Sequence, residues 1–473
     1  RHCMGRPLYC MANNKMWIPD LGESPLPRYL ALVEAIARAI ACGDLKPGAR
    51  LPPQRRLAWA LGWNPSTTMQ AYREAARRHL VSGEVGRGTY VLAGSQEATL
   101  FRLQQVDEQA ARIDLRTNVP AIDHIGQSDA QALSGLLASG QAIRLQGYLS
   151  AADLLRARVQ GALWFKGRGL ELAVDNIMLC TGAQQGLFTV LLSLCQAGEP
   201  VLVEAFTAPG IKAACAQLRL PMHGVVMDCQ GIVPEDFDRM IRATGARIAV
   251  LTPTLQNPTS ALMSVERKQE IARIARRHGV WVVEDDVYGA LTDSPPLYRY
   301  LPDFGVLVSS LSKTVAAGVR MGWIVASAPL LERIDPHAQS AHWGVAPLCV
   351  AIACQWISDG TAHERAQWQT LEVTRRWRLA KKLLAAAMYQ SDTPSPHIWL
   401  SVAQGDVSLA EACRGAGVDV VPGDVFAVKS TTINGVRISL TAAESALTLK
   451  VALERIAGII RLDKNLQERA CSR

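Results

Sequence analysis

The region from Asp114 to about Leu462 alternates short apolar runs with longer stretches of helical character, and this alternation restricts the possible folds most strongly. Strands that alternate with helices are typical of an α/β fold with a parallel sheet. The runs that we interpret as strands are residues 176–179, 200–203, 247–252, 280–284 and 322–326. In such sheets ligands bind at the carboxyl ends of the strands, so polar residues that follow a run are candidates for a site.

A different pattern occupies residues 16–93. Apolar residues at helical spacing predict a first helix over 30–40, and two further helices follow, joined by a tight turn that contains Gly62 and the N-cap candidate Asn64. Residues 84–92 have the pattern of two short strands with a glycine-rich turn, which predicts a wing. The region therefore indicates a winged helix-turn-helix domain, mainly α-helical.

Positive charge is concentrated in the same part of the chain. Residues 1–95 carry 13 Lys and Arg against 6 Asp and Glu, while the whole chain of 473 residues has a net charge of +8. The remaining residues are therefore nearly neutral. A local basic excess indicates a polyanionic partner for the first part of the chain. A solvated basic face without a partner is the alternative that charge alone leaves open.

The first turn of a recognition helix normally faces the major groove of DNA. Hydroxyl and amide side chains there can contact base edges, while arginines nearby contact phosphates and position the domain without specifying sequence. The expected base contacts are Ser66, Thr67, Thr68 and Gln70, and the expected phosphate or wing contacts are Arg50, Arg56, Arg73 and Arg87. We therefore expect double-stranded promoter DNA as a partner.

Several classes of protein do not match the sequence. No apolar run approaches the roughly 18 residues that a membrane-spanning helix needs, and no segment resembles a signal peptide. The 11 cysteines are scattered without the spacing of a zinc site, so we expect reduced thiols, no metal site and a cytoplasmic location. Residues 1–15 are expected to be a disordered leader, and residues 94–113 a linker.

Lys313 lies at the centre of the segment SSLSKTVAAGVRMGW and is the only charge between Val306 and Val319. Partial desolvation disfavours the ammonium and lowers its pKa, which leaves a neutral amine that can attack a carbonyl and form a Schiff base. Hydroxyls and a guanidinium close by would suit a phosphate dianion. These groups belong to Ser310, Ser312 and Arg320.

Three further polar segments each follow an apolar run: TGAQQ, TPTLQNPTS and EDDVYG. The backbone amides of TGAQQ lead into a predicted helix and can hold a phosphate at its positive end. Strand ends of a parallel sheet share one edge, so the three segments and Lys313 indicate one site. The residues of interest are Ala183, Gln184, Asn257, Asp285 and Tyr288.

SSLSK together with RMGW resembles the cofactor-lysine segment of the fold-type I aminotransferases, which use pyridoxal phosphate. The resemblance implies that Lys313 carries the cofactor. It implies that Asn257 and Tyr288 contact the ring oxygen, and that Asp285 keeps the pyridine nitrogen protonated. The remaining implied contacts are Ala183, Gln184, Ser310, Ser312 and Arg320 for the phosphate, Tyr148 for the phosphate of a neighbouring subunit, and Arg437 and Asn118 for the substrate.

The N-terminal region resembles the GntR-type winged helix in the segments GDLKPGARLPPQRRLA, AYREA and GEVGRGTYV. A winged helix fused to an aminotransferase-like domain is the architecture of the MocR subfamily of GntR regulators. This resemblance implies a pyridoxal-phosphate-dependent transcriptional regulator that senses an amino compound or a cofactor vitamer through Lys313, and a homodimer. The large domain is expected over residues 114–328 and a smaller C-terminal α/β subdomain over 329–473.

Two alternatives stay open. The chain has every group that an active aminotransferase needs, and the DNA-binding domain would then be incidental. A regulator that has lost the cofactor is the other, because Ala208 stands where the family has an aromatic residue stacked on the cofactor ring. Such stacking contributes about 0.5–1.5 kcal/mol beyond the buried area. Ser260 also replaces a glycine that is common in the family.

Overall fold

The computed structural model describes residues 17–19, 21, 27–41, 44–45, 49–77, 80–84, 88–91, 112–122, 135, 147–342, 344–389, 392–402, 408–429 and 434–471. Contacts divide the chain into two compact units, Arg1–Leu103 and Gln104–Arg473. The division falls inside the segment 94–113 that the sequence suggests as a linker. The leader expected over residues 1–15 lies outside the described residues.

The described part of the first unit consists of three helices and an antiparallel strand pair. Its elements are α1 (Arg28–Ala41), α2 (Gln54–Ala60), α3 (Pro65–Arg77), β1 (Val81–Glu84) and β2 (Gly88–Val91). Helix α3 begins where the sequence predicts, because Asn64 Oδ1 accepts the Ser66 backbone amide at 2.9 Å and Pro65 takes the first helical position. Apolar side chains of all five elements share one core, so this unit is a winged helix-turn-helix.

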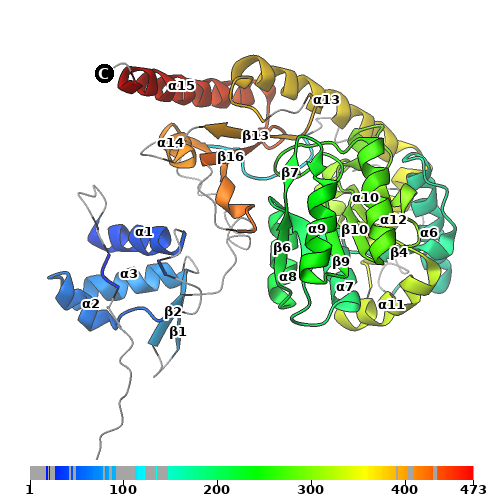
Figure 1. The fold of residues 1–473 in the computed structure, drawn as a ribbon, viewed down its shortest axis with the longest axis horizontal. Coiled ribbons are helices and arrows are strands. Elements are labelled where there is room, and N and C mark those ends of the chain that lie inside the picture. Colours follow the sequence, from blue (N-terminus) through cyan, green and yellow to red (C-terminus); the bar gives the residue numbers. More distant parts are fainter. Residues whose placement is uncertain are drawn as a thin grey trace, which may run out of the picture. The chain divides into compact units, whose positions relative to one another are not determined.

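The second unit is built around a seven-stranded sheet (Figure 1). Its strands, in spatial order, are β4 (Ile177–Cys180), β12 (Gly322–Val325), β11 (Gly305–Ser310), β10 (Trp281–Asp285), β9 (Ile248–Leu251), β5 (Val201–Glu204) and β6 (Met222–Val225). From β11 to β6 the strands are parallel. All but β6 coincide closely with apolar runs of the sequence, whereas His223 and Gly224 interrupt the apolar pattern in β6.

Strand β12 runs antiparallel to both of its neighbours, which corrects the all-parallel sheet expected from the sequence. The reason lies in the connection before it. A parallel crossover needs about a dozen or more residues, usually with a helix, whereas residues 311–321 form only two tight turns between β11 and β12. The chain therefore turns back alongside β11, and the turn carries Lys313 and Arg320.

Helices cover both faces of the sheet, as is usual for parallel strands. Alternate side chains of β11 enter different clusters: Val306 and Val308 pack on one face and Leu307 on the other. The first face is covered by α7 (Ala183–Leu194), α8 (Pro209–Gln217) and α11 (Ala328–His342). The second face is covered by α6 (Ala151–Lys166), α9 (Pro234–Thr244), α10 (Val265–His278) and α12 (Pro347–Ser358) (Figure 1).

A smaller subdomain follows in the C-terminal part of the chain. Its three-stranded sheet has the order β13 (His397–Val402), β16 (Asn434–Ser439) and β15 (Val421–Pro422). The helices that share its core are α13 (Thr361–Leu384), α14 (Leu409–Gly415) and α15 (Ala446–Cys471). In the large domain, β7 (Met227–Asp228) and β8 (Gly231–Ile232) form a short hairpin.

Residues 112–122, here called the N-terminal strap, pack on the small subdomain before they reach the large domain. Within the strap, β3 (Ile113–Asp114) pairs in parallel with β14 (Val418–Asp419) of the small subdomain. Leu115 is completely buried in the core of that subdomain. The first strap residues therefore belong to the small subdomain, although the sequence suggests a large domain that starts at residue 114.

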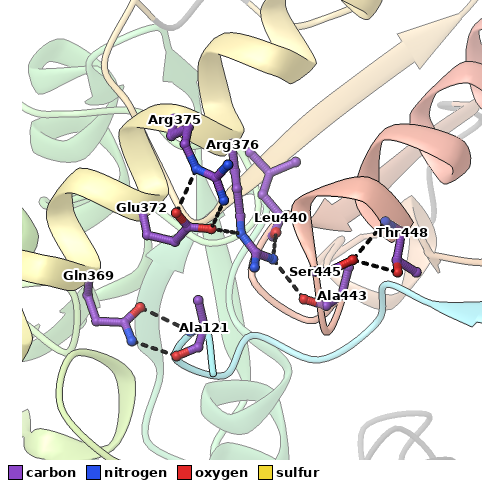
Figure 2. Close-up of polar contacts among 9 residues, drawn as sticks. All are labelled: Ala121, Gln369, Glu372, Arg375, Arg376, Leu440, Ala443, Ser445 and Thr448. Atoms are coloured by element: carbon purple, nitrogen blue, oxygen red, sulfur yellow. Dashed lines mark hydrogen bonds and ion pairs between the residues drawn. The ribbon is translucent and has the colours of Figure 1, made fainter. Parts of the chain in front are cut away.

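Helix α13 holds the end of the strap, as Figure 2 shows. The Gln369 side chain accepts the backbone N–H of Ala121 at 3.0 Å and donates to its backbone oxygen at 2.8 Å. Two turns further along the same helix, buried Arg376 donates to the backbone oxygens of Leu440 and Ala443 at 2.9 and 2.8 Å. One helix thus fixes both the strap and the loop after β16.

Candidate functional site

Lys313 ends a single helical turn, Leu311–Lys313, that directly follows β11. Its Nζ donates a hydrogen bond to the backbone oxygen of Asn118 in the strap, at 2.6 Å. Burial of the amine and, after it, the positive charge of Arg437 lower the pKa of Lys313 to about 8, while Asp285 opposes the shift. The direction is the one that desolvation predicts, and the neutral fraction at neutral pH is far larger than for an ordinary lysine.

Asp285 is the last residue of β10, at the carboxyl end of the strand. Its Oδ1 atom is buried and has no hydrogen-bond partner among the described residues. Burial and the neighbouring carboxylate of Asp286 raise the pKa of Asp285 to about 7, and Lys313 works against this rise. A buried carboxylate oxygen without a partner costs free energy unless a ligand supplies a donor. Such an oxygen can accept a hydrogen bond from a donor such as a protonated ring nitrogen.

Arg320 and the start of α7 together form a place for an anion. The Arg320 side chain is exposed, and its Nη1 and Nη2 donate to the Ser312 hydroxyl at 3.4 Å and the Thr181 backbone oxygen at 3.3 Å. Gly182 has a φ of 78°, and a Cβ on it would lie 2.8 Å from Arg320 Nη2, so glycine lets the guanidinium lie against this turn. The first N–H groups of α7 have no acceptor within the helix, which makes its N-terminus attractive to anions.

The other residues expected at the phosphate have different surroundings. Ser310 is buried at the end of β11, and Ala183 is the first residue of α7. The Gln184 side chain donates to the backbone oxygen of Gly210 at 2.8 Å. This bond uses one of the two N–H donors of that side chain, and the backbone amide of Gln184 also remains for an anion.

Tyr288 and Asn118 lie in a buried hydrogen-bonded chain with His397, which the sequence interpretation missed. Asn118 Nδ2 lies 2.8 Å from the Tyr288 hydroxyl and 3.0 Å from His397 Nδ1. His397 Nε2 in turn lies 2.9 Å from the backbone oxygen of Gln256. His397 belongs to β13 of the small subdomain, far along the chain from its partners, so no local sequence pattern points to it.

Arg437, on β16, is buried, and its guanidinium lies 5.2 Å from the centre of the Phe426 ring. Its Nη1 donates to Asn257 Oδ1 at 3.0 Å, and its Nη2 donates to the backbone oxygen of Arg116. Within the described part of the chain its buried Nε has no acceptor. Burial lowers the pKa of Arg437 to about 10, so the side chain remains a cation at neutral pH. A buried guanidinium with an unused donor can bind a carboxylate.

Three positions noted in the sequence lie further from this constellation or depart from the family. Tyr148, just before α6, is 77% exposed, as a residue that serves a neighbouring subunit would be. Ala208 is half-buried at the start of α8 and offers no ring for stacking. Ser260 has a φ of 65°, which glycine adopts more easily, and its hydroxyl donates to the backbone oxygen of His397 at 2.7 Å.

The residues present fit pyridoxal phosphate, the cofactor that the family resemblance implies. Lys313 offers an amine of lowered pKa for the aldehyde, and Asp285 offers an unpaired oxygen for the ring nitrogen. Arg320 and the N-terminus of α7 offer positive charge for the phosphate. When bound, such a cofactor supplies a reactive carbonyl and an electron sink for amino compounds.

The lowered pKa of Lys313 sets how fast the cofactor-free protein reacts with pyridoxal phosphate at each pH. The rate constant should rise with pH and level off above about 8, rather than near 10.5 as for an ordinary lysine. Arg437→Met removes a positive neighbour and should raise the midpoint, whereas Asp285→Asn removes a negative neighbour and should lower it. Stopped-flow absorbance across neutral and alkaline pH measures the midpoints, and a parent midpoint near that of free lysine would contradict the expectation.

The same shift has a consequence for stability. In the unfolded chain Lys313 regains its ordinary pKa of 10.5, so between pH of about 8 and 10.5 the unfolded chain binds more protons than the folded one. The contribution of Lys313 to the stability of the cofactor-free protein therefore rises with pH across this window.

On the first unit, Ser66, Gln70 and Arg73 lie at positions i, i+4 and i+7 of α3 and are exposed, so they share one face of the helix. This face presents one hydroxyl, one amide and one guanidinium to solvent. The remaining expected contacts are Arg50 and Arg56, which are exposed, Thr67, which is half-buried, and Arg87, which lies outside the described residues.

The expectation that Thr68 contacts a base is wrong. Its side chain has 0% exposure, and its Oγ1 lies within hydrogen-bond distance of the backbone oxygens of Pro65, at 3.0 Å, and Gln54, at 3.1 Å. Residues two apart point to nearly opposite sides of a helix, so when Ser66 is exposed Thr68 faces the core. Thr68 therefore joins α3 to the start of α2.

The described residues contain no helix that is both long and apolar enough to span a membrane. Nor do they bring together three or more His, Cys, Asp or Glu side chains that could hold a metal ion.

Comparison with known proteins gives a match for each unit. Residues 110–456 match the family described as aminotransferase class I and II, and residues 28–91 match the bacterial regulatory proteins of the gntR family. The HTH-type transcriptional regulator YdeF of Bacillus subtilis (strain 168) is 26% identical, over 94% of this chain and 97% of its own. The HTH-type transcriptional regulator NorG of Staphylococcus aureus (strain N315) is 23% identical, over 66% of this chain and 75% of its own.

Among solved structures, an archaeal alanine:glyoxylate aminotransferase has a TM-score of 0.70 at 21% identity, over 78% of this chain and 96% of that chain. Similarity at this identity shows the fold, while the family match spans well over half of the chain. The chain therefore belongs to the class I and II aminotransferase family, and it joins that fold to a GntR-type DNA-binding domain in the architecture of the MocR-type transcriptional regulators.

Proposed function

We propose that this transcriptional regulator holds pyridoxal phosphate through Lys313 and uses the cofactor to sense an amino compound. One observation carries the proposal. The chain that contains the GntR-type domain also keeps a lysine of lowered pKa beside an unpaired buried carboxylate oxygen and an exposed arginine at a helix N-terminus. Burial disfavours the charged forms of Lys313 and Asp285 in the protein alone, and each of the three groups would have a partner on the cofactor.

Each residue has a distinct task in the proposed site. Lys313 forms the covalent link, because its neutral amine is available near physiological pH. Asp285 keeps the ring nitrogen protonated, and Arg320 binds the phosphate with the amides that begin α7. Arg437 binds the carboxylate of an amino acid effector through its unused donor, if the effector carries one.

Sensing follows from competition for the carbonyl of the cofactor. An amino compound that takes the place of Lys313 frees the lysine amine, which can then donate again to the Asn118 backbone oxygen of the strap. The two arrangements differ in what holds the strap. A ligand shifts DNA affinity only as far as its affinity differs between two such states, so this difference must amount to about 5.5 kcal/mol for a change from 1:99 to 99:1.

A homodimer is part of the proposal. Helix α6 exposes Leu155, Val159 and Leu163, which recur every four residues and form an apolar stripe along one side of the helix. Exposed Tyr148 lies three residues before the start of this helix. A second copy that covers the stripe would bring Tyr148 close to an interface, as the tyrosine expected at a neighbouring phosphate requires. We expect this dimer in the cytoplasm, because that is where it would bind operator DNA.

The exposed face of α3 should divide its tasks between Gln70 and Arg73. We expect Gln70→Ala to weaken binding to a selected operator by about 1–3 kcal/mol, roughly 5- to 150-fold, with little effect on random DNA. Arg73→Ala should weaken binding to both DNAs and reduce the salt slope by about one ion. Fluorescence anisotropy over a series of salt concentrations measures both effects. Arg273→Ala, at an exposed site on α10, is the matched control.

A uniform loss of affinity for all DNAs in Gln70→Ala would contradict the base contact. The same titrations, repeated with amino compounds, separate the regulator from the alternative of a working aminotransferase. A change in operator affinity on addition of an amino compound supports the regulator. Rapid conversion of an amino acid with a keto acid in the absence of DNA, without any change in operator affinity, would support the enzyme.

A further inference from the structure

Four groups form a continuous buried chain that ends at the proposed cofactor site. The chain runs from the Gln256 backbone oxygen to His397, then to the Asn118 amide, and finally to the Tyr288 hydroxyl. The three side chains are at most 5% exposed, and the rings of Tyr288 and His397 lie 5.5 Å apart. The strap, the large domain and the small subdomain each contribute a member.

The donors and acceptors in this chain are fixed by its first member. A backbone oxygen can only accept, so His397 Nε2 must carry the ring proton and His397 Nδ1 must be the acceptor. The Asn118 amide nitrogen then faces Nδ1 with one N–H and the Tyr288 oxygen with the other. The Tyr288 hydroxyl accepts from Asn118, and its own proton is left to be donated elsewhere.

The opposite orientation of the Asn118 amide is excluded by the same contacts. It would set the Asn118 Oδ1 against the His397 Nδ1 lone pair at 3.0 Å. The observed orientation leaves Asn118 Oδ1 buried and without a partner in the described part of the chain. An unsatisfied buried oxygen is unfavourable, so His397 holds the amide in an orientation that Asn118 would otherwise leave.

His397 keeps this role over the accessible pH range. Burial lowers the pKa of His397 to about 3, with smaller contributions from the positive charges of Arg437 and Lys313, and the Gln256 oxygen opposes the shift. The imidazole is therefore neutral near physiological pH, and His397 Nδ1 stays an acceptor. Tyr288 is itself a titratable member of this chain, and Asp285 is the other titratable group of the site that borders it.

We propose that His397 is a positioning residue that, through Asn118, directs the Tyr288 hydroxyl proton toward the ring oxygen of the bound cofactor. The proposal rests on the proposed function, because it requires the cofactor at Lys313. A donor at the ring oxygen stabilises negative charge there, and this lowers the pKa of the Lys313 nitrogen once it is linked to the cofactor. His397 thereby sets how readily an amino compound displaces the lysine.

The first test uses the pH midpoint of the visible band of the cofactor-loaded, full-length protein. In His397→Phe the Asn118 amide can turn over, and Asn118 Oδ1 then accepts the Tyr288 hydroxyl, so that proton no longer faces the cofactor. We expect the midpoint to rise by about 0.5 to 1 pH unit, the size of one redirected hydrogen bond. His397→Gln keeps both an acceptor and a donor, so its midpoint should return most of the way to that of the parent protein.

Two controls isolate the effect. His363→Phe replaces an exposed histidine of α13 and should leave the midpoint unchanged. In a Tyr288→Phe background, His397→Phe should cause no further shift, because the hydroxyl that it acts through is gone. A shift that persists in that background would show that His397 acts by packing or charge alone and would overturn the proposal.

The second test needs no cofactor. In the cofactor-free protein labelled with nitrogen-15 histidine, we expect His397 to show a protonated Nε2 and an unprotonated Nδ1, assigned by loss of the signals in His397→Phe. A protonated Nδ1 would overturn the proposed positioning role of His397. If the parent protein gives no band with pyridoxal phosphate, the proposed function fails and this proposal fails with it. An unchanged midpoint in His397→Phe would overturn the positioning role of His397 but leave the proposed function intact.

Discussion

Replacing Lys313 with alanine is expected to abolish the pH-sensitive visible band that the protein develops with pyridoxal phosphate. The loss should be complete, because alanine has no nucleophile for the carbonyl. Lys268 is another buried lysine with a lowered pKa, but its Nζ already donates to Ser294 and to Pro295, both at 2.7 Å. Absorption spectra recorded over a range of pH, with and without added cofactor, measure the effect.

Lys166→Ala, at an exposed position near the end of α6, provides the control and should keep the band. The Lys313→Ala protein should still bind DNA, because α3 belongs to the separate first unit, but it should no longer respond to amino compounds. A band of parental intensity in Lys313→Ala would sink the covalent link. A parent without a band, even in excess cofactor, would instead direct attention to Ala208 and its missing ring.

The sequence predicts most of the sheet because each strand is a local feature. An apolar run of four to six residues is enough to predict a strand. The topology of the sheet then places the residues at the ends of the strands, such as Asp285 and Lys313, at one edge. The direction of β12 depends on the short connection before it. The all-parallel expectation fails there because it considers the apolar runs alone and not the short connection over residues 311–321 that joins two of them.

His397 and Thr68 show where local patterns stop. His397 can be recognised as part of the site only in the folded protein, where β13 lies next to Asn118 of the N-terminal strap. The sequence also does not show that the strap begins on the small subdomain, because β3 has only two residues. Thr68 belongs to a run of similar polar residues, all of which the sequence suggests as DNA contacts, although a helix places them on different sides. Helical periodicity, applied residue by residue, would have separated Thr68 from Ser66 and Gln70.

The two adjacent aspartates at the end of β10 should differ sharply in what their removal does. Asp286 forms a buried ion pair with Arg168, Oδ1 to Nη2 at 3.1 Å, and the side chains are 1% and 6% exposed. Arg168 also donates to the Thr292 backbone oxygen at 3.0 Å, so the pair holds the loop that follows Asp285. Asp286→Ala would leave a guanidinium buried without its counter-ion, which destabilises a protein by about 3–5 kcal/mol.

The matched control is Asp303→Ala, which breaks a pair with Arg276 of similar length, 2.7 Å, whose side chains are both 46% exposed. Water can solvate the remaining arginine at this exposed position, so the loss of stability should be about 0–1 kcal/mol. Urea unfolding of the second unit, followed by tryptophan fluorescence, compares the two variants. Equal losses would contradict the assignment of Asp286 to the framework.

A double replacement separates the loss of a partner from the worth of the pair itself. Arg168→Met combined with Asp286→Leu removes both charges, so no ion remains buried alone, and much of the stability lost in Asp286→Ala should return. Asp285→Asn, one residue away, should change stability far less, because its Oδ1 has no partner to lose in the described structure, yet it should impair cofactor binding. Stability would then depend on Asp286 and cofactor binding on Asp285, although the sequence presents them as one motif.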